Sequence, residues 1–212
     1  MACPICNKRK AKRLCLARAE SICSICCGTE REVTINCPSD CTFLQASRDY
    51  DLSRLEIDWS KLPFQEIKFN RSFAKTHEPL LLALELAICV FAAEHREVVD
   101  TDVQAALQTL AEAYRTRASG IIYEKPLDYA LQRALYESLK AALEDLRKDE
   151  AQRAGMTTLR DSEVRDALIF LTQLSAVHAN GRPKGRAYLD LIRSQFPKEE
   201  FKKAASSIVL PY

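Results

Sequence analysis

The positions of the hydrophobic residues divide the chain into two unlike parts. After residue 76, apolar residues recur every three or four positions over long stretches, which is the period of helices that bury one face. Before residue 76 no such period is sustained, and many of the non-polar positions are cysteines. The pattern therefore predicts a helical domain preceded by a part that hydrophobic packing alone does not shape.

The helical part is expected to be a bundle of five or six helices. Residues 80–93 are apolar at thirteen of fourteen positions, so the first helix, opened by Pro79, is expected to be central and buried. Further helices are expected to start at Asp100, at Pro126, at Asp161 or Ser162, near Tyr188 and at Pro197. Their expected ends are Ser119-Gly120, Gly155 and Asn180-Gly181.

Glu85 is the one charged residue in the apolar run. A buried carboxylate must pair with a donor, take up a proton or face a gap in the fold. It is therefore either a satisfied structural group or part of a pocket. The lone Cys89 in the same run is interpreted as a small core residue.

Residues 51–76, most of the expected connector at 45–76, carry many large apolar side chains without a long period, among them Trp59 and Phe69. A disordered tether would hardly carry so many large apolar groups, so we expect a connector packed on the helical domain. Trp59 is either an anchor for a partner or a staple that holds the connector to the core.

The cysteines are the residues in this sequence that indicate a specific chemistry. Eight of the nine cysteines lie within the 39 residues from Cys3 to Cys41: Cys3, Cys6, Cys15, Cys23, Cys26, Cys27, Cys37 and Cys41. A CxxC pair folds back so that both thiolates bind one zinc ion, and two such pairs complete a tetrahedron. The sequence predicts that all eight bind metal, as two zinc ions.

Three other readings of the cysteines fit less well. Disulfides need an oxidising compartment, and the short start before Cys3 leaves no room for a signal peptide. A thioredoxin-like redox pair would need a βαβ pattern around the CxxC, which is absent. An iron–sulfur cluster would also use thiolates, but eight thiols in knuckle-like pairs suit two zinc ions better.

The residues between the ligands predict a treble-clef-like unit. Arg31–Asn36 alternates, with Val33 and Ile35 on one face, and is expected to be a short strand. Gly28 is expected to permit a tight turn. A helix is expected to start at Pro38 and to carry Cys37 and Cys41 on one face.

The cysteine run, with the pairs Cys3/Cys6 and Cys37/Cys41 at its ends, resembles the cross-brace double-zinc fingers of the MYND, HIT and B-box kind. The resemblance covers about the first 41 residues and rests on cysteine spacing. Arg18 stands where those families place the CxxC partner of Cys15, and Cys26 is the candidate to fill that place. The resemblance implies a binding module, not an active site.

Two groupings of the ligands fit the spacing. One is Cys3, Cys6, Cys23, Cys27 with Cys15, Cys26, Cys37, Cys41; the other is Cys3, Cys6, Cys15, Cys27 with Cys23, Cys26, Cys37, Cys41. Either grouping uses all eight thiols, so neither zinc keeps an open position for water. Closed zinc sites are structural and open ones are catalytic.

The net charge of the chain is small, but basic residues gather in two short segments. The net charge is +2, and eight thiolates with two zinc ions bring it to about −2, so the chain is not a globally basic nucleic-acid binder. Two compact basic clusters are candidate contacts for an anion or a nucleic acid: Lys8, Arg9, Lys10, Lys12 and Arg13, and Arg182, Lys184 and Arg186. Their alternative readings are charge compensation of the thiolates and a solvated turn.

The sequence thus predicts a mainly α protein with a zinc module at 1–44, a connector at 45–76 and a helical bundle at 77–212. No phosphate loop, nucleophile elbow or HExxH motif is present, so no catalytic residue is assigned. We expect a cytoplasmic, zinc-binding adaptor or regulator with a protein partner. The alternative is a nucleic-acid binder, and no membrane span is expected.

Overall fold

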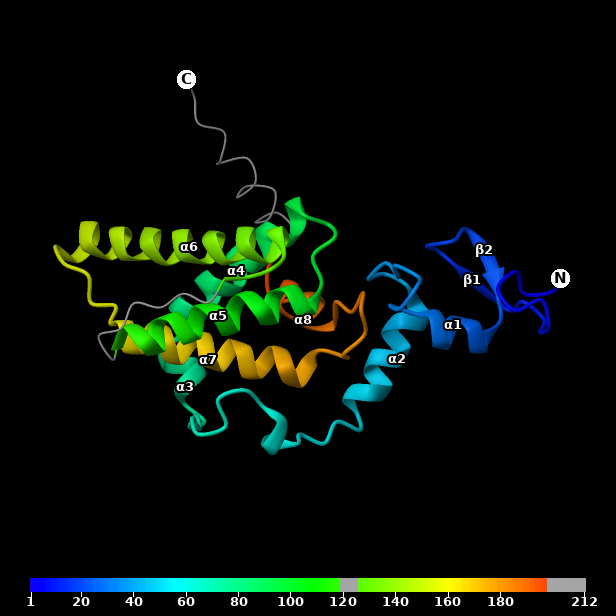
Figure 1. Cartoon of the computed structure of the whole chain (residues 1–212), viewed down its shortest axis with the longest axis horizontal. Coiled ribbons are helices and arrows are strands. Elements are labelled where there is room, and N and C mark those ends of the chain that lie inside the picture. The colour runs from blue at the N-terminus through cyan, green and yellow to red at the C-terminus, as the bar shows by residue number, and fades with distance from the viewer. Residues whose placement is uncertain (119–125, 198–212) are drawn as a thin grey trace, which may run out of the picture. The chain divides into compact units, whose positions relative to one another are not determined.

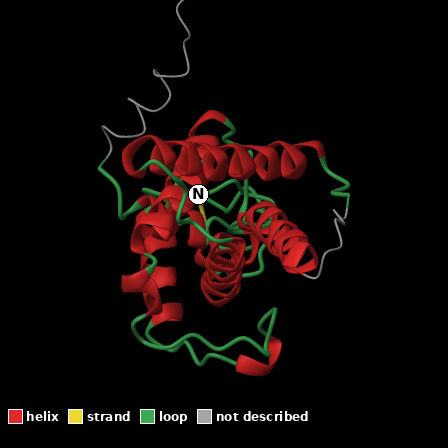
Figure 2. Cartoon of the chain, turned by 90° about the vertical axis from the view of Figure 1, so that its left-hand side faces the viewer, coloured by secondary structure: helices red, strands yellow, loops and turns green. Residues whose placement is uncertain are grey.

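The computed structural model describes residues 1–118 and 126–197. Within these ranges the chain has eight α-helices and one short β-hairpin near the N-terminus (Figures 1 and 2). The mainly α fold class expected from the sequence, with a small cysteine-rich part at the N-terminus, is confirmed.

The chain packs as two compact units. The first, called here the finger unit, comprises Met1–Ile57 together with Ala179–Ala187. The second, the helical unit, comprises Asp58–His178 and the chain from Tyr188 onward. The domain limits expected from the sequence remain a prediction, because compact packing is not evidence that a part folds independently.

The finger unit holds four regular elements. Strand β1 (Arg13–Cys15) pairs antiparallel with β2 (Glu20–Ile22), and they are followed by helices α1 (Ser24–Glu30) and α2 (Thr42–Leu52). Ala19, in the turn that joins the strands, has a left-handed backbone with φ of 53°. The small core of this unit consists largely of cysteines with Ile22 and Ile35.

Three local expectations for the finger unit are wrong. Residues 31–36 form no strand, because the amides of residues 33–35 all donate to the carbonyl of Glu30 and close a tight turn. Gly28 lies inside α1 and not in a turn. The next helix starts at Thr42, with Cys41 as its N-cap, and not at Pro38.

Among the residues that the structure describes, five helices follow Thr76, and apart from Ala187 they lie in the helical unit. They are α4 (Glu78–Glu94), α5 (Asp100–Ala118), α6 (Ala130–Ala154), α7 (Asp161–His178) and α8 (Ala187–Arg193), preceded by a 3-10 turn at Trp59–Lys61 and by α3 (Phe73–Thr76). The core lies mainly between α5 and α7 and between α4 and α6. None of the described helices is both long and apolar enough to cross a membrane.

Some helix limits differ from the expected ones. Helix α6 begins at Ala130 and not at Pro126; the side chain of Arg133 donates to the carbonyls of Leu127 and Asp128 in the non-helical approach. Gly155 closes α6 in the left-handed conformation, as expected. The expected stop at Ser119-Gly120 and the expected helix after Pro197 fall outside the described residues.

The chain between the two parts changes character along its length. Leu62 is buried, and Phe64, Ile67 and Phe69 pack against the helical core. The amide of Gln173 on α7 donates to the carbonyls of residues 63, 64 and 67 at 3.0–3.3 Å. Residues 51–61, in contrast, are exposed, and Trp59 is 69% exposed.

Candidate metal centre

Four cysteines of the finger unit form one tight cluster. The Sγ atoms of Cys3, Cys6, Cys23 and Cys26 all lie within 4.8 Å of one another, and those of Cys6 and Cys23 are 3.9 Å apart. A tetrahedron with metal–sulfur bonds of about 2.3 Å has edges of about 3.8 Å. The cluster therefore has the size and the donor set of a zinc site, and it could hold one ion.

The first two ligands come from a knuckle that the backbone closes on itself. The amide of Cys3 donates to the carbonyl of Arg9, and the amide of Asn7 donates to the carbonyl of Cys3, both at 2.8 Å. Asn7 has a φ of 50°, which turns the chain back after Cys6. The amides of Lys8 and Arg9 then donate to the Cys6 sulfur and lower its pKa to about 6.

The other two ligands come from the start of α1. Cys23 is the N-cap of the helix, and its sulfur accepts from the amide of Cys26 at 3.4 Å. Cys26 lies three residues on, so both sulfurs face the same side of the first turn. Knuckle, β-structure and helix start thus follow in the expected order, but they are formed by residues 3–30 and not by residues 23–41.

The electrostatics of the cluster favour a bound cation. Burial and the neighbouring sulfurs of Cys23, Cys6 and Cys3 raise the pKa of Cys26 to about 12, while the pKa of Cys6 is lowered. Four thiolates at this spacing repel one another, so all four ionise together only when a cation lies between them. All four positions of a tetrahedral ion would then be filled by protein.

The structure changes the grouping of the cysteines. Cys23 and Cys26 share one cluster with Cys3 and Cys6, a combination that neither grouping from the sequence contained. The reason is the helix: a spacing of three at its first turn brings two side chains together, whereas Cys27 is rotated by about 100° away from Cys26.

The remaining four cysteines of the array also lie in the finger unit. Cys15, Cys27 and Cys37 pack against the small core, and Cys41 is buried. Burial raises the pKa of Cys37, as do the charges of Cys41 and Cys15, while the amide of Glu32 donates to its sulfur. Among the described residues, these four do not form a second cluster as tight as the first.

A buried arginine contacts one sulfur of this second set of cysteines. Arg31 is buried, and its guanidinium donates to the sulfur of Cys27 at 3.8 Å. A buried guanidinium needs acceptors around it, and the sulfur of Cys27 is one of them. Cys89 lies in the hydrophobic core of the helical unit, where burial raises its pKa to about 12.

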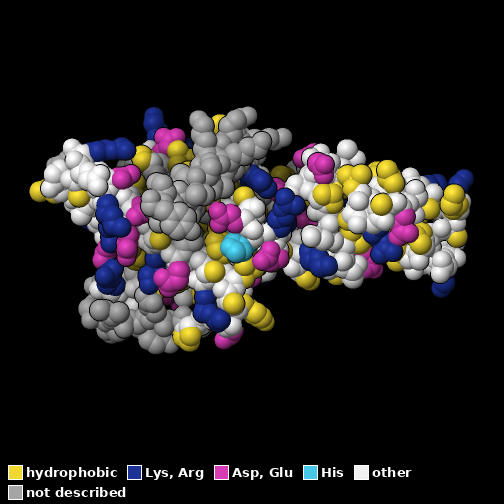
Figure 3. Space-filling model, turned by 90° about the horizontal axis from the view of Figure 1, so that it is seen from above, with side chains coloured by type: hydrophobic (Ala, Val, Ile, Leu, Met, Phe, Trp, Pro, Cys, Tyr) yellow, Lys and Arg dark blue, Asp and Glu magenta, His cyan; other side chains and the backbone are white. Residues whose placement is uncertain are grey.

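The first basic cluster surrounds the knuckle. The side chains of Lys8, Arg9, Lys10 and Lys12 are exposed, and the guanidinium of Arg13 lies over the ring of Phe43 at 4.7 Å from its centroid. In Figure 3 both Lys/Arg and hydrophobic side chains lie on the surface at the N-terminal end of the molecule.

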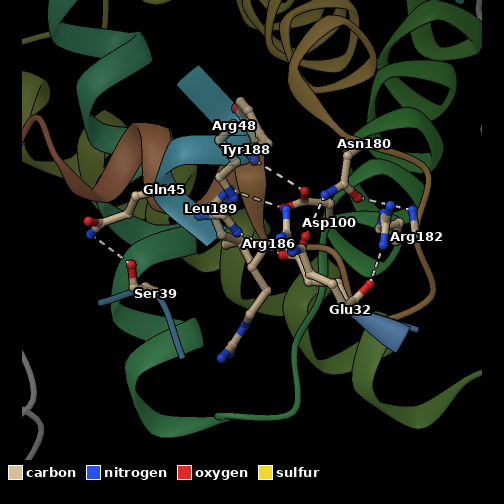
Figure 4. Close-up of polar contacts among 11 residues, drawn as sticks. Glu32, Ser39, Gln45, Arg48, Asp100, Asn180, Arg182, Arg186, Tyr188 and Leu189 are labelled. Carbon is tan, nitrogen blue, oxygen red and sulfur yellow. Dashed lines mark hydrogen bonds and ion pairs between the residues drawn. The ribbon is translucent and has the colours of Figure 1, made fainter. Parts of the chain in front are cut away.

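The second basic cluster has partners inside the finger unit. Arg182 donates to the carbonyls of Gly28 and Arg31, and Lys184 donates to the carbonyl of Thr34 at 2.7 Å. The backbone amide of Arg186 donates to the carboxylate of Glu32 (Figure 4). Two of the three side chains offered as anion contacts are thus engaged with main-chain carbonyls.

Glu32 is the residue that sequence reasoning missed. Its side chain is 2% exposed, and its carboxylate accepts from Arg48 at 2.8 Å and from Asn180 at 2.7 Å. Its backbone is left-handed, with a φ of 52°. No periodic or spacing signal marks a single glutamate in this loop, because its partners are 16 and 148 residues away along the chain.

Glu85 is buried in α4, 5% exposed. Burial raises its pKa to about 7, and a hydrogen bond with the side chain of Gln195 partly offsets that rise. The fully buried hydroxyl of Tyr188 has no hydrogen-bond partner among the described residues.

The chain was compared with known proteins by sequence and by structure. It matches no protein-family model, no curated protein and no solved structure.

Proposed function

We propose that this protein is a zinc-binding, non-catalytic adaptor or regulator that acts through protein–protein interaction. The observation that supports it is the four-sulfur cluster of Cys3, Cys6, Cys23 and Cys26, in which protein would fill all four ligand positions. A zinc ion without an open position stabilises a fold and activates no water. The zinc would then shape the finger unit, and the surface of that unit would do the binding.

The proposal includes a second zinc ion, held by Cys15, Cys27, Cys37 and Cys41. These are the four array cysteines that the first cluster leaves over. Two of them already accept a hydrogen bond at sulfur: Cys27 from Arg31, and Cys37 from the amide of Glu32. Binding of the ion would draw the four sulfurs together.

Metal counting tests both sites separately. Native mass spectrometry of the full chain is expected to find two zinc ions per molecule. The variants Cys6→Ser and Cys37→Ser are each expected to hold one, and the control Cys89→Ser is expected to hold two. One ion in the unaltered chain would contradict the second site, and none would contradict the whole proposal.

Exposed apolar side chains on the finger unit are the expected contact surface for a partner. Leu14 on β1 is 57% exposed and Ile25 on α1 is 50% exposed. Burying an exposed apolar side chain against a partner is favourable, and a few buried anchors carry most of the binding energy of an interface. Neither side chain packs in the small core of the unit.

A charge placed at these positions tests the contact surface. The variant Leu14→Asp/Ile25→Asp is expected to keep two zinc ions and to lose partner proteins in nuclease-treated affinity capture at high salt. The control Met156→Asp alters an equally exposed apolar residue, 66% exposed, in the helical unit and is expected to retain them. Equal capture by both variants would place the partner's contacts elsewhere.

Nucleic-acid binding is the second candidate, and the exposed basic cluster around the knuckle favours it. Neutralising Lys8, Arg9, Lys10, Lys12 and Arg13 together would remove up to five phosphate contacts. In the unaltered chain, the affinity for RNA or DNA should fall steeply as salt is added. A plot of the logarithm of the binding constant against the logarithm of the salt concentration should have a slope of roughly −0.7 to −0.9 per phosphate contact. The neutralised variant should show neither the affinity nor the slope.

A further inference from the structure

Residues 179–187 lie against the rest of the finger unit in the way that a bound peptide would. Five donor groups of this segment make six hydrogen bonds to acceptors in residues 28–34. They are the side-chain amide of Asn180, the guanidinium of Arg182, which serves two carbonyls, the ammonium of Lys184, and the backbone amides of Lys184 and Arg186. Figure 4 shows Asn180, Arg182 and Arg186 of the segment beside Glu32.

The finger unit offers these donors an acceptor-rich surface. The carbonyls of Gly28, Arg31 and Thr34 accept from side chains, and the carbonyl of Glu32 accepts from the amide of Lys184 at 2.8 Å. The buried carboxylate of Glu32 adds two more acceptor atoms at the centre. We call residues 28–34 the acceptor loop.

The segment itself carries little else that could hold it there. Its sequence, Ala-Asn-Gly-Arg-Pro-Lys-Gly-Arg-Ala, contains no large apolar side chain. Recognition therefore rests on donors: cationic side chains at alternate positions, Arg182 and Lys184, together with two backbone amides. Hydrogen bonds from charged donors are about twice as strong as those between neutral groups.

We infer that the acceptor loop is a binding site for basic peptides, and that residues 179–187 occupy it in cis as a competitor. The partner would present an Arg/Lys-rich segment with cations two residues apart. This inference rests on the proposed function as a protein-binding module, and it names the class of partner.

Tethering explains why residues 179–187 would exclude a free peptide from the acceptor loop in the unaltered chain. A segment held at both ends has an effective concentration of about millimolar or above, so a free peptide of equal intrinsic affinity competes poorly. Weakening the cis segment by substitution should open the acceptor loop to the same peptide supplied in trans.

The experiment uses the chain's own segment as the probe. The full chain with Asn180→Ala, Arg182→Ala and Lys184→Ala loses four side-chain hydrogen bonds to the acceptor loop. A synthetic peptide of residues 179–187 is titrated in while the amide signals of the acceptor loop are followed by NMR. The triple variant is expected to bind at least tenfold more tightly than the unaltered chain.

Two controls separate recognition from general attraction. A scrambled peptide of the same composition should bind the triple variant at least tenfold more weakly. Adding Glu32→Gln to the triple variant should weaken binding of the matching peptide, while an added Glu20→Gln, elsewhere on the finger unit, should leave it unchanged. The zinc content of every variant is measured, so that a folding defect is recognised.

A zinc-loaded triple variant that fails to bind the peptide up to about 5 mM, the scale of the tether's effective concentration, would overturn the inference. Equal binding of the scrambled peptide would overturn it too. Neither result touches the proposed function, which fails instead if the finger unit holds no metal or if its apolar surface captures no partner.

Discussion

At the scale of single residues, two buried carboxylates are stabilised in opposite ways. Glu32 lies 2.8 Å from the guanidinium of Arg48 and accepts from the side chain of Asn180, so its burial is compensated by an ion pair and a hydrogen bond. Glu85 has the side chain of Gln195 as its hydrogen-bond partner, and burial raises its pKa to about 7. We therefore expect Glu85 to make stability depend on pH.

Glu85 should make the helical unit less stable as the pH rises. Its pKa in the folded state, about 7, lies above its ordinary value of 4.5, so the folded state holds the proton more tightly. The contribution of protonated Glu85 to the free energy of unfolding is fully present below about pH 4.5 and is lost as the pH rises through about 7. At 1.36 kcal/mol per pKa unit, the loss amounts to up to about 3 kcal/mol.

Glu85→Gln should remove this dependence and stabilise the protein by about 1–3 kcal/mol at pH 8. Urea unfolding at pH 5 and at pH 8, followed by helical circular dichroism, measures it. Glu94→Gln, at the exposed end of the same helix, is the control and should change stability little. A similar gain from both substitutions at pH 8 would contradict the account.

At the scale of elements, turn and cap chemistry sets the helix limits. Gly155 ends α6 with a φ of 77°, a conformation that suits glycine, whereas Gly28 sits inside α1 with nothing within 4 Å of where a Cβ would be. The sequence predicted the role of Gly155 from the apolar period that stops there. It assigned Gly28 a turn, because one glycine beside cysteines carries no period.

The two glycines form a matched pair of substitutions. Gly155→Ala should destabilise the helical unit by about 1 kcal/mol, because alanine is strained in a left-handed conformation. Gly28→Ala should be neutral or stabilise the finger unit by up to about 1 kcal/mol, because alanine favours a helix interior. Thermal unfolding of zinc-loaded protein measures both, and a loss at Gly28 as large as at Gly155 would be contrary evidence.

The start of α8 depends on a carboxylate from another helix. Asp100, 2% exposed at the start of α5, accepts from the backbone amides of Tyr188 and Leu189, each at 3.1 Å. Asp100→Ala should cost about 2–3 kcal/mol, since it leaves two buried amides without an acceptor. Asp100→Asn keeps one acceptor oxygen and should recover about half of that loss in urea unfolding. No difference between the two variants would show that the cap is not the cause.

At the scale of the whole molecule, each of the two units is stabilised by a different kind of interaction. The helical unit has a hydrophobic core of leucine, isoleucine and valine from α4 to α8. The finger unit has a core made largely of cysteine, so its stability should depend on bound metal. Residues 179–187 belong to the finger unit although they follow α7 in the chain.

Removal of zinc should therefore act on two separate stretches of sequence. Addition of a chelator is expected to abolish amide hydrogen-exchange protection in residues 1–57 and in residues 179–187. Most of the helical circular dichroism should survive, because α4 to α7 keep their core. Simultaneous loss of protection in α4 to α7 would show that the two units do not respond independently.

The sequence by itself predicted the mainly helical fold and a cysteine-rich part that could hold metal. Both are local signals: the apolar period from Leu80 onward predicts buried helix faces, and closely spaced cysteines predict a metal site, which the cluster of four sulfurs supports. Only the tertiary structure decided that Cys23 and Cys26 share a site, and that Glu32 receives Asn180 from 148 residues away. Ligand sets and polar contacts of this kind depend on which atoms meet after folding, and no spacing rule along the chain encodes that.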